Sequence, residues 1–317
     1  MMQTIPLQVA AMTARRQARP GMILMMIAML LLPLGDTFAK LLTGVLDPLA
    51  VTMWRVIAQG LFLVPVAFFL RRRLRGAMFS PLVAFSGGLL AASLSSLILA
   101  FSVMPIATTI AIFFVEPLIL TLLAGPLLGE RAGPRRLLAV LVGLVGAMIV
   151  IRPGFADYGW VTVLPLLSAL AYALNMIVLK RASLTRSALT VQCGATVFAA
   201  LWLGIAVGGL HLGGVLSAVP RGEAIWPWGA ILCAGAVAAT CFVLIAEAFR
   251  TSDATTLAPF QYFEILTATA LGFVIFGDFP DAATWIGVAI ILGSGLYIFH
   301  REGIRDTEAP RRKRIVR

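Results

Sequence analysis

The chain has 317 residues, of which 60% are hydrophobic and only 12% charged, whereas an ordinary soluble domain is about a quarter charged. A chain this apolar cannot cover a soluble core with polar surface, so the composition indicates a protein embedded in a lipid bilayer. The formal net charge is +11, but no basic surface with interleaved aromatic residues accompanies it, and basic residues of membrane proteins collect in cytoplasmic loops, so we expect no nucleic-acid partner.

The first apolar run begins at Met22, and three arginines at positions 15, 16 and 19 precede it. A charged segment followed by an apolar run is also typical of a secretory signal peptide. No convincing small-residue cleavage site follows before the charged residues Asp36 and Lys40. We therefore interpret residues 1–21 as a cytoplasmic N-terminal segment and the run after it as a retained first spanning helix.

Apolar runs of about 20 residues, the length that crosses a bilayer as a helix, recur along the chain. The predicted spans are residues 22–42, 49–70, 82–101, 106–128, 134–151, 158–179, 187–208, 226–248, 254–276 and 282–299. The division is least obvious between Ser80 and Leu128, where the one charged residue is Glu116. A single helix of that length would measure about 70 Å, more than twice the hydrocarbon thickness. We therefore expect a turn within Ser102–Pro105.

The basic residues predict the orientation of these ten spans. With a cytoplasmic N-terminus, 21 of the 25 lysines and arginines fall in cytoplasmic segments. Arg152 and Arg221 fall outside, and Lys40 and Arg55 fall within spans. Five tryptophans lie near outer span ends, as an interfacial belt would: Trp54, Trp160, Trp226, Trp228 and Trp285. This distribution predicts an inner (plasma) membrane protein with both termini cytoplasmic and residues 300–317 as a basic tail.

The two halves of the chain match at a constant offset of 148 residues. The matching pairs include Ala100-Phe101 with Ala248-Phe249, Thr108 with Thr256, Glu116 with Glu264, and Gly129-Glu130 with Gly277-Asp278. An odd number of spans in each copy makes the second copy enter the membrane upside down. The sequence therefore predicts an all-α membrane protein of ten transmembrane helices in two inverted five-helix repeats, 22–151 and 158–299, an architecture typical of secondary carriers.

The repeat resembles the drug/metabolite transporter superfamily of EamA type. The residues that carry the resemblance are Ala107–Glu130, with Glu116-Pro117 and the ending Leu128-Gly129-Glu130, and Asp253–Asp278. The resemblance implies a carrier whose central cavity opens alternately to each side of the membrane. Within the superfamily, Asp253–Glu264, Phe276–Asp281 and Gly35-Asp36 with Lys40 are similar to S-adenosylmethionine uptake carriers, and Ala258–Tyr262 is similar to riboflavin importers.

Charged residues inside spans are costly and usually face a cavity or a partner. Asp36 and Lys40 stand four residues apart and share one helix face, so they either neutralise each other or contact a small-molecule substrate. Arg55 either holds a substrate carboxylate or locks two helices through Glu116.

Glu116 and Glu264 are repeat mates near the middle of their spans, so the inverted repeat predicts similar depths for them. Each either binds a cationic centre of the substrate, carries a coupling proton, or forms a structural salt bridge to Arg55 or Lys40.

Polar residues near these carboxylates are further candidates for lining a cavity. Gln261 stands three residues before Glu264 and shares its face, whereas Tyr262 lies about 160° away around the helix. Tyr172 and Asn175 are likewise three residues apart. Each of these residues either lines the cavity or joins one helix to another. For a sulfonium cargo, Tyr262 would offer an aromatic face.

Several absences bear on the class of function. The sequence holds no GxxxxGK[ST] loop for ATP and no cluster of His, Cys or Asp that a membrane enzyme would need, so we expect a secondary carrier with no cofactor and no metal. A membrane-embedded enzyme and a non-transporting membrane protein are the alternatives. The spacings Ala139-Gly143-Ala147 and Ala289-Gly293 predict close helix packing, within the chain or in a homodimer. S-adenosylmethionine is the first expected cargo, and riboflavin or an amino acid the alternative.

Overall fold

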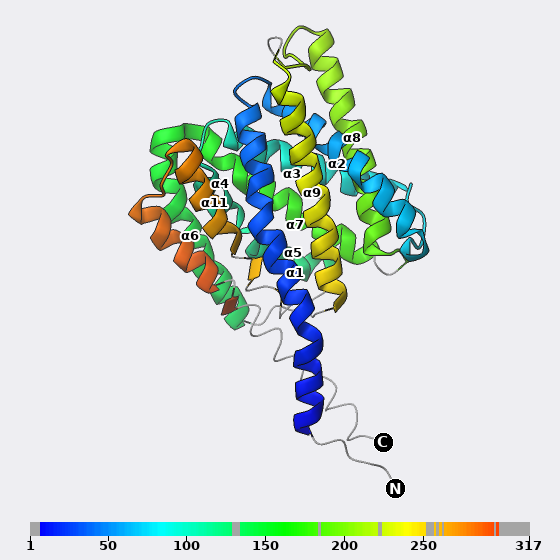
Figure 1. Cartoon of the computed structure of the whole chain (residues 1–317). Coiled ribbons are helices and arrows are strands. Elements are labelled where there is room, and N and C mark those ends of the chain that lie inside the picture. The colour runs from blue at the N-terminus through cyan, green and yellow to red at the C-terminus, as the bar shows by residue number, and fades with distance from the viewer. Residues whose placement is uncertain are drawn as a thin grey trace.

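The computed structural model describes residues 7–128, 134–182, 185–220, 224–251, 257, 260–261, 263–294 and 296–297, and every regular element in them is a helix (Figure 1). Seven of these helices are long and apolar enough to cross a membrane, and three shorter apolar helices lie at Leu137–Ile151, Phe263–Phe276 and Ala282–Ser294. The all-helical membrane class is therefore confirmed. The predicted residues Tyr262 and 300–317 lie outside the described residues.

Most elements follow the predicted spans, but α1 begins at Leu7, within the segment 1–21 that was expected to precede the first span, and the predicted span 106–128 is divided into two helices. They are α1 (Leu7–Leu42), α2 (Pro48–Phe69), η1 (Arg71–Arg73), α3 (Pro81–Phe101), α4 (Ile106–Phe113), α5 (Glu116–Leu128), α6 (Pro134–Tyr158), η2 (Gly159–Val163), α7 (Leu164–Ala182), α8 (Ala188–Leu212), α9 (Trp226–Thr251), α11 (Phe263–Leu271), the π-helix η3 (Gly272–Phe276) and the helix Ala282–Ser294. One expected break is misplaced. Helix α6 continues through 152–154 to Tyr158, and the chain turns at Gly159, whose φ of +61° a glycine adopts without strain.

Helix starts carry the residues that sequence rules favour. Pro48 and Pro81 stand in the first turns of α2 and α3, where a missing N–H costs nothing. Ser80 accepts a hydrogen bond from Val83 N, and Ser187 accepts one from Thr190 N. These caps satisfy N–H groups that a helix leaves unpaired at its start, and α3 and α8 accordingly begin within one residue of their predicted starts.

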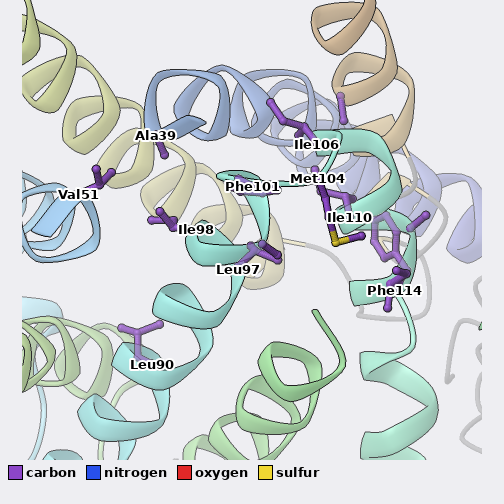
Figure 2. Packing of buried hydrophobic residues seen from close by; sticks show 14 of the residues in the cluster. Ala39, Val51, Leu90, Leu97, Ile98, Phe101, Met104, Ile106, Ile110 and Phe114 are labelled. Atoms are coloured by element: carbon purple, nitrogen blue, oxygen red, sulfur yellow. The ribbon is translucent and has the colours of Figure 1, made fainter. Parts of the chain in front are cut away.

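The expected turn between α3 and α4 is confirmed, and apolar side chains bury it. Phe101, Met104 and Ile106 are fully buried at its two sides, and Figure 2 shows Ile98, Phe101 and Met104 clustered where α3 passes into α4. These side chains contact other buried apolar side chains, and the contacts hold the turn against the core.

Helices α4 and α5 form one span with an interruption at its centre. The helix stops at Phe113, and α5 starts at Glu116 with Pro117 in its first turn. Proline lacks an N–H and clashes with a preceding turn, which explains the interruption at this point. As a result, Glu116 stands at the start of a half-helix inside the bundle, a position that carriers use for ligand contacts.

Contacts between helices recur in the two halves. Helix α1 packs on α9 as α3 packs on α7, and α2 packs on α9 as α3 packs on α8. Where α3 packs on α8, Gly87 of α3 lies against α8, and where α2 packs on α9, Gly235 of α9 lies against α2. These two glycines stand 148 positions apart, which is the spacing of the sequence repeat. The two halves therefore share one packing plan.

The small-residue face of α6 is used within the chain. A Cβ added at Gly143 would contact Ser294 and Leu118, and one at Gly146 would lie 2.8 Å from Ile290. The face thus packs α6 against the helix Ala282–Ser294 and is not free for a second copy. Gly293 has open space around it.

The outward surface of the bundle is apolar. Phe68, Leu138 and Val274 are 64%, 62% and 78% exposed. A surface of this kind suits a lipid environment, as the composition predicted. Polar and charged side chains, in contrast, gather between the helices, and three of them define the centre of the candidate site.

Candidate substrate-binding site

A buried ion pair joins α1 to α2 at the centre of the bundle. Arg55 Nη2 lies 3.0 Å from Asp36 Oδ1, and the two side chains are only 6% and 4% exposed. Gly35 leaves room for the guanidinium, because a Cβ there would lie 3.5 Å from Arg55 Nη2 and 3.3 Å from Val237. The pairing of Asp36 with Lys40 and the Arg55–Glu116 lock, both considered from the sequence, are wrong, because α2 presents Arg55 to Asp36.

The guanidinium of Arg55 has unused donor capacity. Its Nη1 is buried and makes no hydrogen bond within the described part of the chain. A buried donor without a partner is costly, typically by about 1–3 kcal/mol. A ligand oxygen that accepts from Nη1 would remove this cost.

Glu264 lies next to this pair. It stands in the first turn of α11, is 8% exposed, and interacts electrostatically with both Asp36 and Arg55. Helix α11 packs on α1, which explains how residues 228 positions apart in the sequence come together. Among the described residues Glu264 forms no salt bridge within 4 Å, so the structural pairing with Arg55 or Lys40 does not occur.

Sequence reasoning overlooked Cys241 of α9. Its thiol is buried, donates to Ala28 O at 3.5 Å, and interacts electrostatically with Asp36 and Glu264. The repeat offset could have pointed to Cys241, because its repeat mate Ser93 stands 148 positions earlier. The Ser93 hydroxyl donates to Ser168 O at 3.1 Å. Both side chains fasten one half to the first helix of the other half.

Tyr172 connects the two repeat-related carboxylates. It belongs to α7, packs edge-on against Phe113 with ring centroids 5.7 Å apart, and interacts electrostatically with Glu116 and Glu264. Glu116 Oε1 is buried and accepts no hydrogen bond from the described residues. The site thus extends from the Asp36–Arg55 pair past Glu264 and Tyr172 to Glu116.

The structure gives different positions to the remaining residues that were predicted to line the cavity. Asn175 Oδ1 accepts from Ser86 Oγ at 2.5 Å, with both residues buried, so Asn175 joins α7 to α3. Gln261 is half-buried. Tyr262 lies outside the described residues.

Lys40 stands apart from this centre. Its Nζ lies 2.8 Å from Asp278 Oδ2 and 3.0 Å from Met104 O, and 4.6 Å from the centroid of the Phe276 ring. These partners lie at the end of the bundle where α1 ends. Lys40 therefore pairs with the second half of the chain and not with Asp36, whereas its contact with a substrate stays a prediction.

The chemistry of the central site follows from its charges. Asp36, Glu116 and Glu264 supply three carboxyl groups against the one guanidinium of Arg55. No group of three or more His, Cys, Asp or Glu in the described segments has the geometry to hold a metal ion. The arrangement offers carboxyl acceptors to a cation, Arg55 Nη1 as a donor with no partner among the described residues, and the aromatic ring of Tyr172.

The chain matches the model of the "EamA-like transporter family" twice, at residues 19–152 and 159–299. It is 30% identical over 205 residues to the riboflavin transporter of Rhizobium johnstonii, and this alignment spans 64% of each chain. It is 31% identical over 212 residues to the riboflavin transporter of Vibrio cholerae, covering 67% of each chain.

A longer alignment relates the chain to another transporter. The S-adenosylmethionine uptake transporter of Rickettsia bellii is 24% identical over 276 residues, which cover 84% of this chain and 89% of that one. A solved crystal structure superposes with a TM-score of 0.58 at 20% identity, covering 87% of this chain and 94% of the other. The structural likeness supports the fold.

Proposed function

The chain belongs to the EamA-like transporter family, and from that premise we propose that it is a secondary carrier which takes up an organic cation, with S-adenosylmethionine as the first candidate cargo. It is a multi-pass protein of the bacterial inner membrane. The observation that carries the proposal is the central site, where Glu264 interacts with the buried Asp36–Arg55 pair and Tyr172 interacts with both Glu264 and Glu116.

The proposed carrier has ten spans in two inverted halves with both termini cytoplasmic. Seven long apolar helices and three shorter ones supply these spans. The contacts that recur between α1, α9, α3 and α7 support a two-fold relation between the halves. The orientation rests on the basic residues, 21 of which the predicted order of spans assigns to the side opposite to Lys40. In this orientation the Lys40–Asp278 end faces outward.

The cargo is inferred from charge. S-adenosylmethionine carries a sulfonium, an amine and a carboxylate. Its carboxylate would accept from Arg55 Nη1, and its two cationic groups would lie against Glu264 and Glu116. The Tyr172 ring, which interacts with both of these carboxyl groups, would attract the sulfonium by a cation–π interaction. The cationic groups of such a cargo would offset the cost of ionising these buried carboxyl groups.

Riboflavin is the second candidate cargo, favoured by the 30% and 31% identity to riboflavin transporters. Its ring carbonyls would also accept from Arg55 Nη1. It carries no cationic centre, however, so Glu116 and Glu264 would have to be protonated to accommodate it.

Uptake of radiolabelled S-adenosylmethionine into cells that express the protein tests the proposal. We expect saturable uptake by the wild type and little change in Glu247→Gln. In Glu264→Gln the uptake rate should fall at least about tenfold, because a buried charge contact is worth more than 1.4 kcal/mol. Glu247 is the matched control, since it pairs with the exposed Arg73 at the other end of the bundle. All variants are compared at equal membrane abundance.

The outcomes separate the cargoes. Uptake that unlabelled S-adenosylmethionine competes away, and riboflavin does not, supports the first candidate. Uptake of labelled riboflavin, with no uptake of labelled S-adenosylmethionine, identifies the second. Absence of uptake of either compound, with the protein present in the membrane, overturns both assignments.

A further inference from the structure

Lys40 holds together three segments at the outward end of the bundle. It stands in the last turn of α1, and its Nζ lies 2.8 Å from Asp278 Oδ2, after η3, and 3.0 Å from Met104 O, in the α3–α4 turn. The ammonium also lies 4.6 Å from the centroid of the Phe276 ring. The contacts of Lys40 with Asp278 and with Phe276 must break if α1 and η3 move apart.

The three segments come from both halves of the chain. Helix α1 and the α3–α4 turn belong to the first half, and Asp278 belongs to the second. A carrier that opens by motion of one half against the other must separate these groups on the side that opens. Lys40 therefore bridges the surfaces between which an outward path would form.

The backbone around Asp278 is fixed, so its carboxylate cannot simply follow Lys40. Gly277 adopts a φ of +73° and its N–H donates to Phe273 O at 3.0 Å, while Asp278 N donates to Gly272 O at 3.1 Å. These two hydrogen bonds and the left-handed glycine cap the C-terminus of η3. Motion of α1 relative to η3 would thus break the ion pair rather than stretch a flexible loop.

The same two helices carry the central site. Asp36 stands one turn before Lys40 on α1, and Glu264 stands on α11, which continues directly into η3. Cargo seated between Asp36 and Glu264 would alter the spacing of α1 and α11, and this spacing determines whether Lys40 reaches Asp278. Lys40 and Asp278 are 16% and 31% exposed in their side chains, so water screens the pair partly and it can open at moderate cost.

We propose that the Lys40–Asp278 pair, together with Met104 O and Phe276, is the outer gate of this carrier, formed when the central site is closed to the outside and broken when it opens. Lys40 then acts on access to the site instead of contacting cargo. The proposal rests on the transport activity of the family and on the orientation proposed above, and it does not depend on which cargo is carried.

The test measures access to the site from outside. Cys193, Cys233 and Cys241 are replaced by serine, and Phe113→Cys places one thiol beside Tyr172. A membrane-impermeant cationic methanethiosulfonate reagent is added to spheroplasts, and the labelling rate is normalised to total labelling by a permeant maleimide, which corrects for misfolded protein. We expect slow labelling with the gate intact and roughly tenfold faster labelling in Lys40→Ala and in Asp278→Ala, because a tenfold population shift needs only ~1.4 kcal/mol.

Two comparisons make the test specific to this pair. The charge swap Lys40→Asp with Asp278→Lys should label at least about threefold more slowly than either single variant, since it restores an ion pair. Arg73→Ala removes the exposed Arg73–Glu247 pair at the other end and should leave the rate unchanged.

The gate is overturned by any of three results. These are single variants that label at the rate of the intact gate, a charge swap as fast as the single variants, or an equal acceleration in Arg73→Ala, which would indicate general loosening of the bundle. Because labelling requires no cargo, failure here is distinguishable from failure of the cargo assignment.

Discussion

At the scale of single residues, the buried Asp36–Arg55 pair dominates the energetics of the site. Two charges taken out of water lose hydration that their mutual attraction only partly returns. The pair here is 3.0 Å apart and almost fully buried, and Arg55 Nη1 has no partner among the described residues. Such an arrangement stabilises the folded protein little, and the donor without a partner favours a role in binding cargo.

A single substitution in this pair should therefore cost more stability than replacement of both residues. Asp36→Leu leaves the Arg55 guanidinium buried without a counter-charge and should lower the free energy of unfolding by about 3–5 kcal/mol. The double variant Asp36→Leu with Arg55→Met removes both charges and should recover most of that loss while transport stays abolished. Thermal unfolding in detergent, followed beside uptake in cells, measures both. A double variant as unstable as the single one would contradict the argument.

At the scale of elements, helix ends place the functional groups. The interruption between α4 and α5 places Glu116 at the start of a half-helix, and the left-handed Gly277 ends η3 just before Asp278. The next helix, Ala282–Ser294, is started by Asp281, whose Oδ1 accepts from Thr284 N at 2.9 Å. These hydrogen bonds to Thr284 hold the pKa of the Asp281 carboxyl below its usual value.

Asp281 should therefore stabilise its helix in a pH-dependent way. Asp281→Ala removes the cap and should cost about 1 kcal/mol near neutral pH, whereas Asp281→Asn retains an acceptor and should cost little. Because the folded pKa is lowered, the added stability of the ionised form is present above the unfolded pKa of about 4 and is lost as pH falls through the folded pKa. Unfolding of the two variants and the wild type between pH 3 and 7 tests this. A cost of Asp281→Ala that is independent of pH would exclude the ionised cap.

At the scale of the whole molecule, two glycines 148 positions apart set the packing between the halves. A Cβ at Gly87 would lie 2.6 Å from Phe198 Cβ and 2.8 Å from Ala195 O, and one at Gly235 would lie 2.7 Å from Gln59 N. These distances are shorter than van der Waals contact, and backbone atoms cannot yield as a flexible side chain does. The bundle therefore depends on both glycines to bring α3 to α8 and α9 to α2.

Alanine at either glycine should destabilise the protein by about 1–3 kcal/mol through overpacking. The chain supplies a matched control for each. A Cβ at Gly88 would meet only Trp202 side-chain atoms at 3.9 Å, and one at Gly229 in α9 would meet nothing within 4 Å. We expect Gly88→Ala and Gly229→Ala to be neutral or slightly stabilising in thermal unfolding. Equal effects at Gly87 and Gly88 would exclude the close contact.

What the sequence by itself determined are the features with a local or periodic cause. Apolar runs of spanning length predicted the helices, and the turn within Ser102–Pro105 followed from length alone. The offset of 148 predicted that Glu116 and Glu264 would be related, and the intramembrane charges predicted which residues deserve a functional hypothesis.

Only the tertiary structure decided which charges meet. Asp36 and Lys40 share a helix face four residues apart, yet Asp36 pairs with Arg55 and Lys40 pairs with Asp278, 238 positions away. The physical reason is that helix packing brings side chains from distant segments within 3 Å, and such contacts outcompete a neighbour on the same helix when the partner is buried. Sequence spacing therefore predicted the groups of the site, whereas the crossing of α1 with α2, α11 and η3 determined their partners.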